Sequence, residues 1–221
     1  MSPRFGGIYY TLMASLPALP EPAQAKRTPI SRPRLDQRLA MLPDEDRATV
    51  DQVEHFLRWA RQPLESTDAE AIELYDTVRR TSTNAVVREL FAYRFDFRVV
   101  IAGLRARLRG WEPLTIDHPI AAQLRRNWEE PSFGLGYRFP WIESVRALLE
   151  QRDSMAVERL LLHTAWRHLS DLELGRYFSL EALIIYLAKW DIVARIAGHD
   201  AEAGRRRFDS LVAEAYGGAT H

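Results

Sequence analysis

Apolar side chains recur at helical spacing along most of the chain. The longest pattern runs from Asn84 to Arg109 and predicts a helix about 40 Å long, at about 1.5 Å per residue. One stripe of this segment is apolar and carries Val86, Leu90, Tyr93, Phe97, Val100, Ile101, Leu104 and Leu108. Gly110 follows, and it is placed to end the helix because glycine adopts the left-handed conformation common after a last turn.

Shorter helical patterns lie on both sides of this segment. Pro43 and the three acids that follow it open a helix, because the positive end of the helix dipole favours acids in the first turn. Thr67 and Glu70 form a capping box before the next one. Further helices are expected at about 141–151, 153–170, 179–197 and 200–216, with at most a short one at about 120–128. Ile8–Met13 could form one short strand, but no series of strands is visible. The predicted class is all-α.

The helical pattern weakens between Gly110 and Pro140, a stretch with four prolines and three glycines. We interpret this stretch as the seam of a helical bundle with two closely joined lobes. The predicted organisation is a proline-rich signature segment with its first helix, a first lobe, a connecting segment and a second lobe, at residues 1–42, 43–110, 111–140 and 141–221.

Composition removes several classes of protein. The 30 basic and 30 acidic residues cancel, so the long-range attraction to nucleic acid expected of a basic chain is absent. The chain has no cysteine, which excludes disulfides, thiolate metal sites and cysteine nucleophiles. The most apolar stretch, Ser179–Gly198, approaches the length of a membrane span but contains four charged residues, and we interpret it as a buried helix.

No group of residues predicts catalysis or metal binding. His163 and His168 are five residues apart, about 140° around a helix, and cannot share the face that an i, i+4 zinc pair requires. Gly134–Gly136 is better interpreted as a turn than as a phosphate loop, and the adjacent Glu129 and Glu130 would point apart. We therefore expect no enzyme, no metal and no cofactor. A small helical enzyme stays an alternative that a pocket with converging ionisable groups would favour.

Arginines form the best candidate surface for a partner. Four of them fall on one side of the long predicted helix, at steps of four, seven and four residues: Arg94, Arg98, Arg105 and Arg109. Such a ridge could bind an acidic surface of a partner protein, because the planar guanidinium group of arginine pairs well with carboxylates. The alternative is a solvated helix face whose arginines pair with nearby acids.

The N-terminal stretch Ile8–Ala25 has the rough shape of a secretion signal, with an apolar run that ends in Ala-Gln-Ala. Its tyrosines and prolines argue against that interpretation. The stretch also carries a resemblance. "YYTLMASLPAL" (Tyr9–Leu19) and "TPIS" (Thr28–Ser31), with "RYFSLEALIIYLAKWDIVAR" and "EAGRRRFDSLV" in the final third, resemble an uncharacterised bacterial family encoded among the components of V-type (archaeal-type) ATPases.

The resemblance implies an intracellular protein that keeps its N-terminal segment. The family signature is expected to be structural and comprises Tyr9, Tyr10, Ala14, Ser15, Leu16 and Pro17. Four of these residues are expected to lock the segment into the fold: Tyr9, Tyr10, Leu16 and Pro17. Operons of this family lack the usual C/d-type stalk component, a helical funnel between the central shaft and the membrane rotor ring. The family resembles a shortened counterpart of that component.

The expected function is therefore a non-catalytic central-stalk subunit that takes part in ion transport. Its partners would be the shaft and the rotor ring, and it would be cytoplasmic and peripheral to the inner membrane through the complex only. An assembly or regulatory factor for the same ATPase is the alternative. Binding to nucleic acid is not expected.

Overall fold

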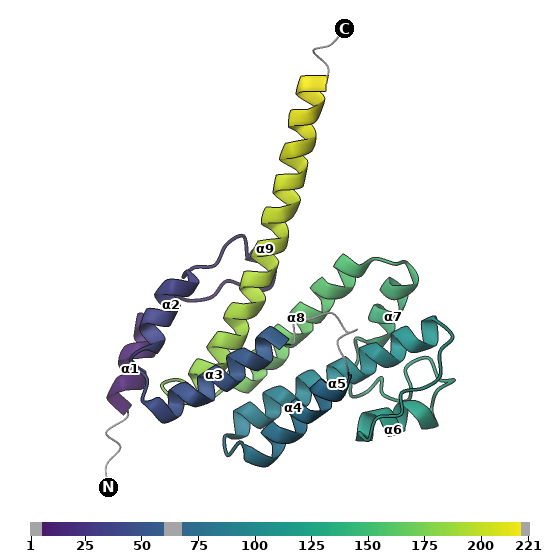
Figure 1. Ribbon diagram of the computed structural model, residues 1–221, viewed down its shortest axis with the longest axis horizontal. Coiled ribbons are helices and arrows are strands. Elements are labelled where there is room, and N and C mark those ends of the chain that lie inside the picture. The colour runs from purple at the N-terminus through teal and green to yellow at the C-terminus, as the bar shows by residue number, and fades with distance from the viewer. Residues whose placement is uncertain (1–5, 60–67, 218–221) are drawn as a thin grey trace. The chain divides into compact units, whose positions relative to one another are not determined.

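The computed structural model describes residues 6–59 and 68–217 (Figure 1). All regular elements of these residues are helical, which confirms the all-α prediction for this part of the chain. In chain order they are α1 (Gly6–Ser15), the 3₁₀ turn η1 (Pro22–Gln24), α2 (Arg32–Leu39), α3 (Asp44–Trp59), α4 (Asp68–Thr81), α5 (Ala85–Leu108), α6 (Pro119–Arg126), α7 (Ile142–Glu150), α8 (Ser154–Glu173) and α9 (Leu180–Gly217).

Contacts divide the chain into two compact units. Unit 1 comprises Met1–Arg47 and Leu169–His221, and unit 2 comprises Ala48–His168. The borders fall inside α3 and α8. Residues 111–140, predicted from the sequence to connect two lobes, belong to unit 2 as a whole.

The first helix of unit 1 corrects a sequence-based expectation. The possible strand at Ile8–Met13 is wrong, because these residues lie within α1. The burial pattern gives the reason. Tyr9 and Leu12 are both buried, and residues three apart share one face of a helix but opposite faces of a strand. α1 packs on α2, whose buried side chains are Leu35 and Leu39.

The last helix is longer than the sequence pattern predicts. Separate helices at 179–197 and 200–216 were expected, whereas α9 is continuous from Leu180 to Gly217, about 57 Å at 1.5 Å per residue. Gly198 does not interrupt it: a glycine inside a helix costs only about 1 kcal/mol, and no proline follows. Residues 182–190 of α9 are all buried. They include Lys189, whose ammonium group pairs with Glu173 at the end of α8.

Unit 2 is built around α5, which packs against α4, α6 and α7. The Asn84 side chain caps α5 by accepting hydrogen bonds from the backbone N–H groups of Val86 and Val87, at 3.0 and 3.2 Å. Gly110 has φ +69°, which confirms its predicted role after the last turn. The capping box expected before α4 involves Thr67, which lies outside the described residues.

Helices α5 and α6 of unit 2 approach each other closely at Gly103. A Cβ atom added to Gly103 would lie 2.9 Å from Leu124 Cδ1, closer than real Cβ contacts. Leu124 is fully buried, so its side chain could move away only by displacing the side chains packed around it. Glycine at position 103 therefore permits this helix pair.

We expect Gly103→Val to lower the free energy of unfolding by about 2 kcal/mol, because overpacking of a filled core costs about 1–3 kcal/mol. Urea denaturation followed by circular dichroism measures the effect. Gly198→Val is the matched control, since nothing lies within 4 Å of a Cβ atom at that helical glycine. Equal destabilisation by the two substitutions would contradict this account of Gly103.

Candidate partner-binding surfaces

The predicted arginine ridge lies on α5 in unit 2. Arg94, Arg98 and Arg105 are half-buried, and each already interacts with other residues of the chain. Arg109 is exposed, and its guanidinium carbon lies 4.7 Å from the centre of the Trp111 ring. The ridge as a partner contact stays a prediction, with Arg109 its most accessible member.

The signature residues at the N-terminus lie in α1 and in the segment after it. The Tyr9 hydroxyl donates a 2.5 Å hydrogen bond to Asp46 Oδ2, and burial, with this carboxylate beside it, raises the pKa of Tyr9. Ser15 Oγ donates to the Leu12 carbonyl at 2.7 Å, and the Leu16 N–H donates to the Met13 carbonyl at 3.2 Å. These bonds hold the end of α1.

The other signature residues differ in exposure. Tyr10 and Ala14 are exposed on α1. The Pro17 carbonyl is bonded to α9, because it accepts a 2.9 Å hydrogen bond from the Tyr186 hydroxyl. Burial raises the pKa of Tyr186 to about 12, so this donor keeps its proton at neutral pH.

A second hydrogen bond from α9 holds the other end of the same segment. Trp190 Nε1 donates to the Ile30 carbonyl at 3.0 Å. Tyr186 and Trp190 are one helical turn apart, so the chain leaves α9 at Pro17 and returns beside its starting point at Ile30. We name the intervening residues 18–29 the proline loop. A compact surface loop with neighbouring ends and its own internal turn, here η1, is an Ω-loop.

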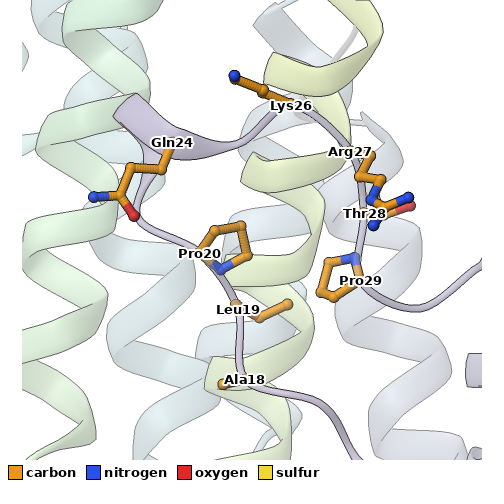
Figure 2. Close-up of a pocket in the computed structure, with 8 residues that line it drawn as sticks. All are labelled: Ala18, Leu19, Pro20, Gln24, Lys26, Arg27, Thr28 and Pro29. Atoms are coloured by element: carbon orange, nitrogen blue, oxygen red, sulfur yellow. The ribbon is translucent and has the colours of Figure 1, made fainter.

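The proline loop surrounds an open hollow of about 730 Å³. Figure 2 shows Leu19 and Pro20 on one arm of the loop and Thr28 and Pro29 on the other. The remaining lining residues are Ala18, Gln24, Lys26 and Arg27. A volume of this size would accept a ligand or a segment of another protein.

Unit 1 also exposes apolar side chains near the turn between α8 and α9. Leu174, Tyr177 and Phe178 are exposed there, and the Phe178 ring lies 4.8 Å from the ring of the exposed Tyr10. We name these four residues the aromatic patch. Contiguous exposed apolar side chains are typical of surfaces that other macromolecules cover.

The interior of unit 2 contains a polar cluster. Asp96 on α5 and His118 at the start of α6 are each only 7% exposed, and Asp96 Oδ1 lies 3.4 Å from His118 Nε2. Arg138 donates to the other carboxylate oxygen of Asp96 at 2.6 Å. His118 Nδ1 accepts the Ile120 N–H at 3.3 Å, which caps α6. The cluster therefore joins α5, α6 and the segment before α7.

Burial has opposite effects on the pKa values of the two buried groups. It raises the pKa of Asp96 to about 6, although Arg138 opposes the rise. It lowers the pKa of His118, and the positive charges of Arg138 and Arg79 lower it further. The pocket beside Phe95 and Arg98 on α5 is apolar and encloses only about 10 Å³, room for one water at most. This arrangement indicates a structural cluster.

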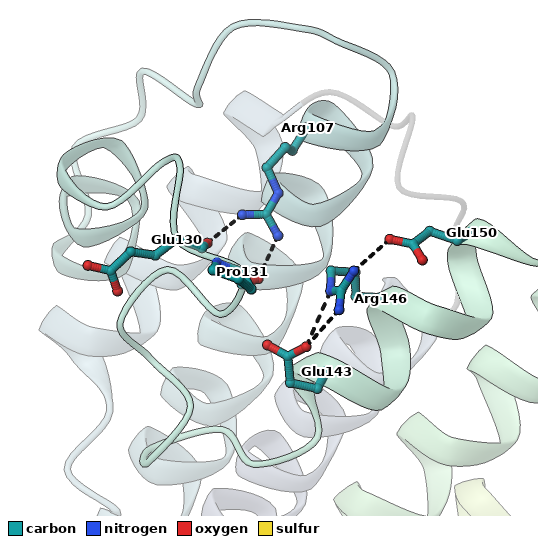
Figure 3. Close-up of polar contacts among 6 residues, drawn as sticks. All are labelled: Arg107, Glu130, Pro131, Glu143, Arg146 and Glu150. Carbon is teal, nitrogen blue, oxygen red and sulfur yellow. Dashed lines mark hydrogen bonds and ion pairs between the residues drawn. The ribbon is translucent and has the colours of Figure 1, made fainter.

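Arg107 is a structural residue that sequence reasoning missed. Its guanidinium donates to the backbone carbonyls of Trp128, Glu130 and Pro131, at 3.2, 2.6 and 2.6 Å, and lies 4.0 Å from the centre of the Phe133 ring. Figure 3 shows Arg107 at the Glu130 and Pro131 carbonyls and Arg146 between two surface carboxylates. No spacing rule links an arginine to carbonyls more than 20 residues away, so the sequence gives no signal for this contact.

Within residues 6–59 and 68–217, and among the side chains that the structure describes there, no cluster of three or more histidine, aspartate or glutamate residues could hold a metal ion. No helix within the same ranges combines the length and the apolar character needed to cross a membrane.

Comparison with known proteins identifies the family. Residues 9–218 match a family described as protein of unknown function (DUF2764). The chain belongs to the DUF2764 family. The match begins at Tyr9, the first residue of the N-terminal signature, and includes the proline loop and α9. Neither the curated proteins nor the solved structures contain a match to this DUF2764 chain.

Proposed function

We propose that this DUF2764 chain is a non-catalytic subunit of a bacterial V-type (archaeal-type) ATPase. It would serve as a central-stalk adaptor of the C/d type, between the rotor shaft and the membrane ring. In this role it is cytoplasmic and peripheral to the inner membrane through the complex.

One observation carries the proposal. The sequence blocks that resemble the ATPase-associated family come from opposite ends of the chain, and they bond to each other in unit 1. Tyr186 and Trp190 from the C-terminal block hold Pro17 and Ile30 from the N-terminal blocks. The resemblance therefore rests on one continuous piece of structure, in which the N-terminal segment is part of the fold.

The surfaces of unit 1 support an adaptor. The aromatic patch and the hollow of the proline loop are both open to contact, and the charged residues that line the hollow, Lys26 and Arg27, are both basic. An adaptor that transmits torque needs rigid helices and complementary faces, and it needs no reacting group of its own.

Deletion of the gene in a host that encodes the ATPase tests the proposal. We expect the assembled catalytic head to keep hydrolysing ATP, while ATP-driven ion uptake into inverted membrane vesicles is lost, because the shaft no longer turns the ring. A plasmid copy should restore uptake. Unchanged uptake per assembled complex would reject the adaptor. Fewer complexes with normal uptake each would instead favour an assembly factor.

A further inference from the structure

Positive charge is concentrated in one part of unit 1. Residues 18–38 contain five basic and two acidic side chains, a net charge of +3 in a chain whose total is zero. Arg32 on α2 pairs with Asp36 at 2.8 Å. The other basic residues of this segment are exposed, and none of them makes an ion pair with a side chain that the structure describes: Lys26, Arg27, Arg34 and Arg38. We name these four residues the cationic surface.

Lys26 and Arg27 lie on the proline loop, which is held in one shape. Hydrogen bonds from Tyr186 and Trp190 of α9 hold the two ends of the loop. Three prolines within the loop, Pro20, Pro22 and Pro29, also fix φ at their positions. A loop that is already ordered loses little conformational entropy when a partner binds. Lys26 and Arg27 are thus presented at the hollow before any partner arrives.

We propose that the proline loop and α2 form a preformed docking surface for an acidic segment of a partner protein. The unpaired positive charges provide the complementarity, and the hollow accepts a protruding segment. A flat anionic bilayer fits a concave surface less well. Residues 18–42 contain no aromatic side chain, so single-stranded nucleic acid has no base-stacking platform here.

An adaptor in any complex could bind an acidic partner through this surface. The docking surface therefore does not depend on the ATPase assignment. Gene deletion tests that assignment, whereas the docking surface is tested with the purified chain alone, so the failure of one can be told from the failure of the other.

The probe is a fluorescein-labelled oligoglutamate peptide, and its binding is measured by fluorescence anisotropy at low ionic strength. We expect the variant Lys26→Glu/Arg27→Glu to bind about tenfold more weakly than the wild type, because two attractive contacts become repulsive. The matched control is Arg126→Glu/Arg167→Glu, which makes the same change in net charge at exposed arginines of unit 2. Equal weakening by the two variants would overturn the proposal, since it would show that only net charge matters.

A second variant tests whether the loop is preformed. Tyr186→Phe keeps every charge and removes the hydrogen bond to the Pro17 carbonyl. We expect severalfold weaker peptide binding with unchanged helical content by circular dichroism. Unchanged affinity in this variant would overturn the preformed loop. Tighter binding to vesicles of equal parts phosphatidylcholine and phosphatidylglycerol, or to oligothymidylate, would overturn the assignment to an acidic protein segment.

Discussion

Replacing Arg107 with alanine should lower the free energy of unfolding by about 3 kcal/mol. The guanidinium donates to three carbonyls of the segment after α6 and packs over the Phe133 ring. A hydrogen bond to a charged group contributes about 1.5–3 kcal/mol, and several bonds from one group sum to less than their separate values. Without this side chain the three carbonyls lose their shared donor, and one of the attachments of the segment to α5 is lost. Urea denaturation monitored by circular dichroism measures the loss.

Two variants separate this role from a general effect of charge. Arg107→Lys keeps the positive charge but cannot reach three carbonyls at once, so it should lose most of the same stability. Arg146→Ala removes a neighbouring arginine that pairs with Glu143 and Glu150 on the surface, at 2.9 and 2.8 Å. Exposed ion pairs contribute less than about 1 kcal/mol. If Arg146→Ala destabilised the chain as much as Arg107→Ala, the role assigned to the carbonyl contacts would be wrong.

Asp96 and His118 should give unit 2 two opposing dependences on pH. Folding raises the pKa of Asp96 from 3.8 to about 6, so between these values the folded state holds a proton that the unfolded state has released. The contribution of Asp96 to stability therefore falls as pH rises from about 4 to 6. The stability of the wild type relative to Asp96→Asn should fall by about 2 kcal/mol over this range, at 1.36 kcal/mol per pKa unit and with an allowance for solvent screening.

The contribution of His118 has the opposite sign. Folding lowers its pKa from 6.5, so at acidic pH the unfolded state holds the extra proton, and stability rises as pH rises toward 6.5. The stability of the wild type relative to His118→Asn should therefore rise with pH, and asparagine keeps an acceptor for capping α6. Denaturant midpoints at several pH values measure both differences. If both stability differences changed with pH in the same direction, or if neither changed with pH, this account of the cluster would be wrong.

The sequence predicts the helices of this chain better than their connections. α5 was predicted because its apolar stripe is long and because Gly110 ends it, and both are local signals. The continuity of α9 was missed, because Gly198 and polar neighbours weaken the pattern without breaking the helix. The pattern predicts a seam at residues 111–140, whereas the segment packs within unit 2 through the hydrogen bonds that Arg107 donates and through the ion pair of Arg138 with Asp96. Contacts between a side chain and a distant carbonyl leave no periodic signal.

The candidate surface shows the same limit. Spacing along a helix identified the arginines of α5, but spacing alone does not show that three of them are half-buried and engaged within the chain. Lys26, Arg27, Arg34 and Arg38 lie in an irregular loop and a short helix, where no periodicity draws attention to them. Two of them, Lys26 and Arg27, lie exposed on a loop whose ends are held on α9 by Tyr186 and Trp190, and these contacts between distant residues have no periodic signal either.

The adaptor role is tested most directly by the composition of the ATPase itself. The complex is purified in detergent through a tag on its catalytic head, washed with high salt, and analysed by quantitative mass spectrometry. We predict that the DUF2764 chain stays in a fixed ratio to the shaft protein before and after the wash. Its absence from the assembled complex, or its loss on washing while the shaft and ring stay together, would contradict a central-stalk role.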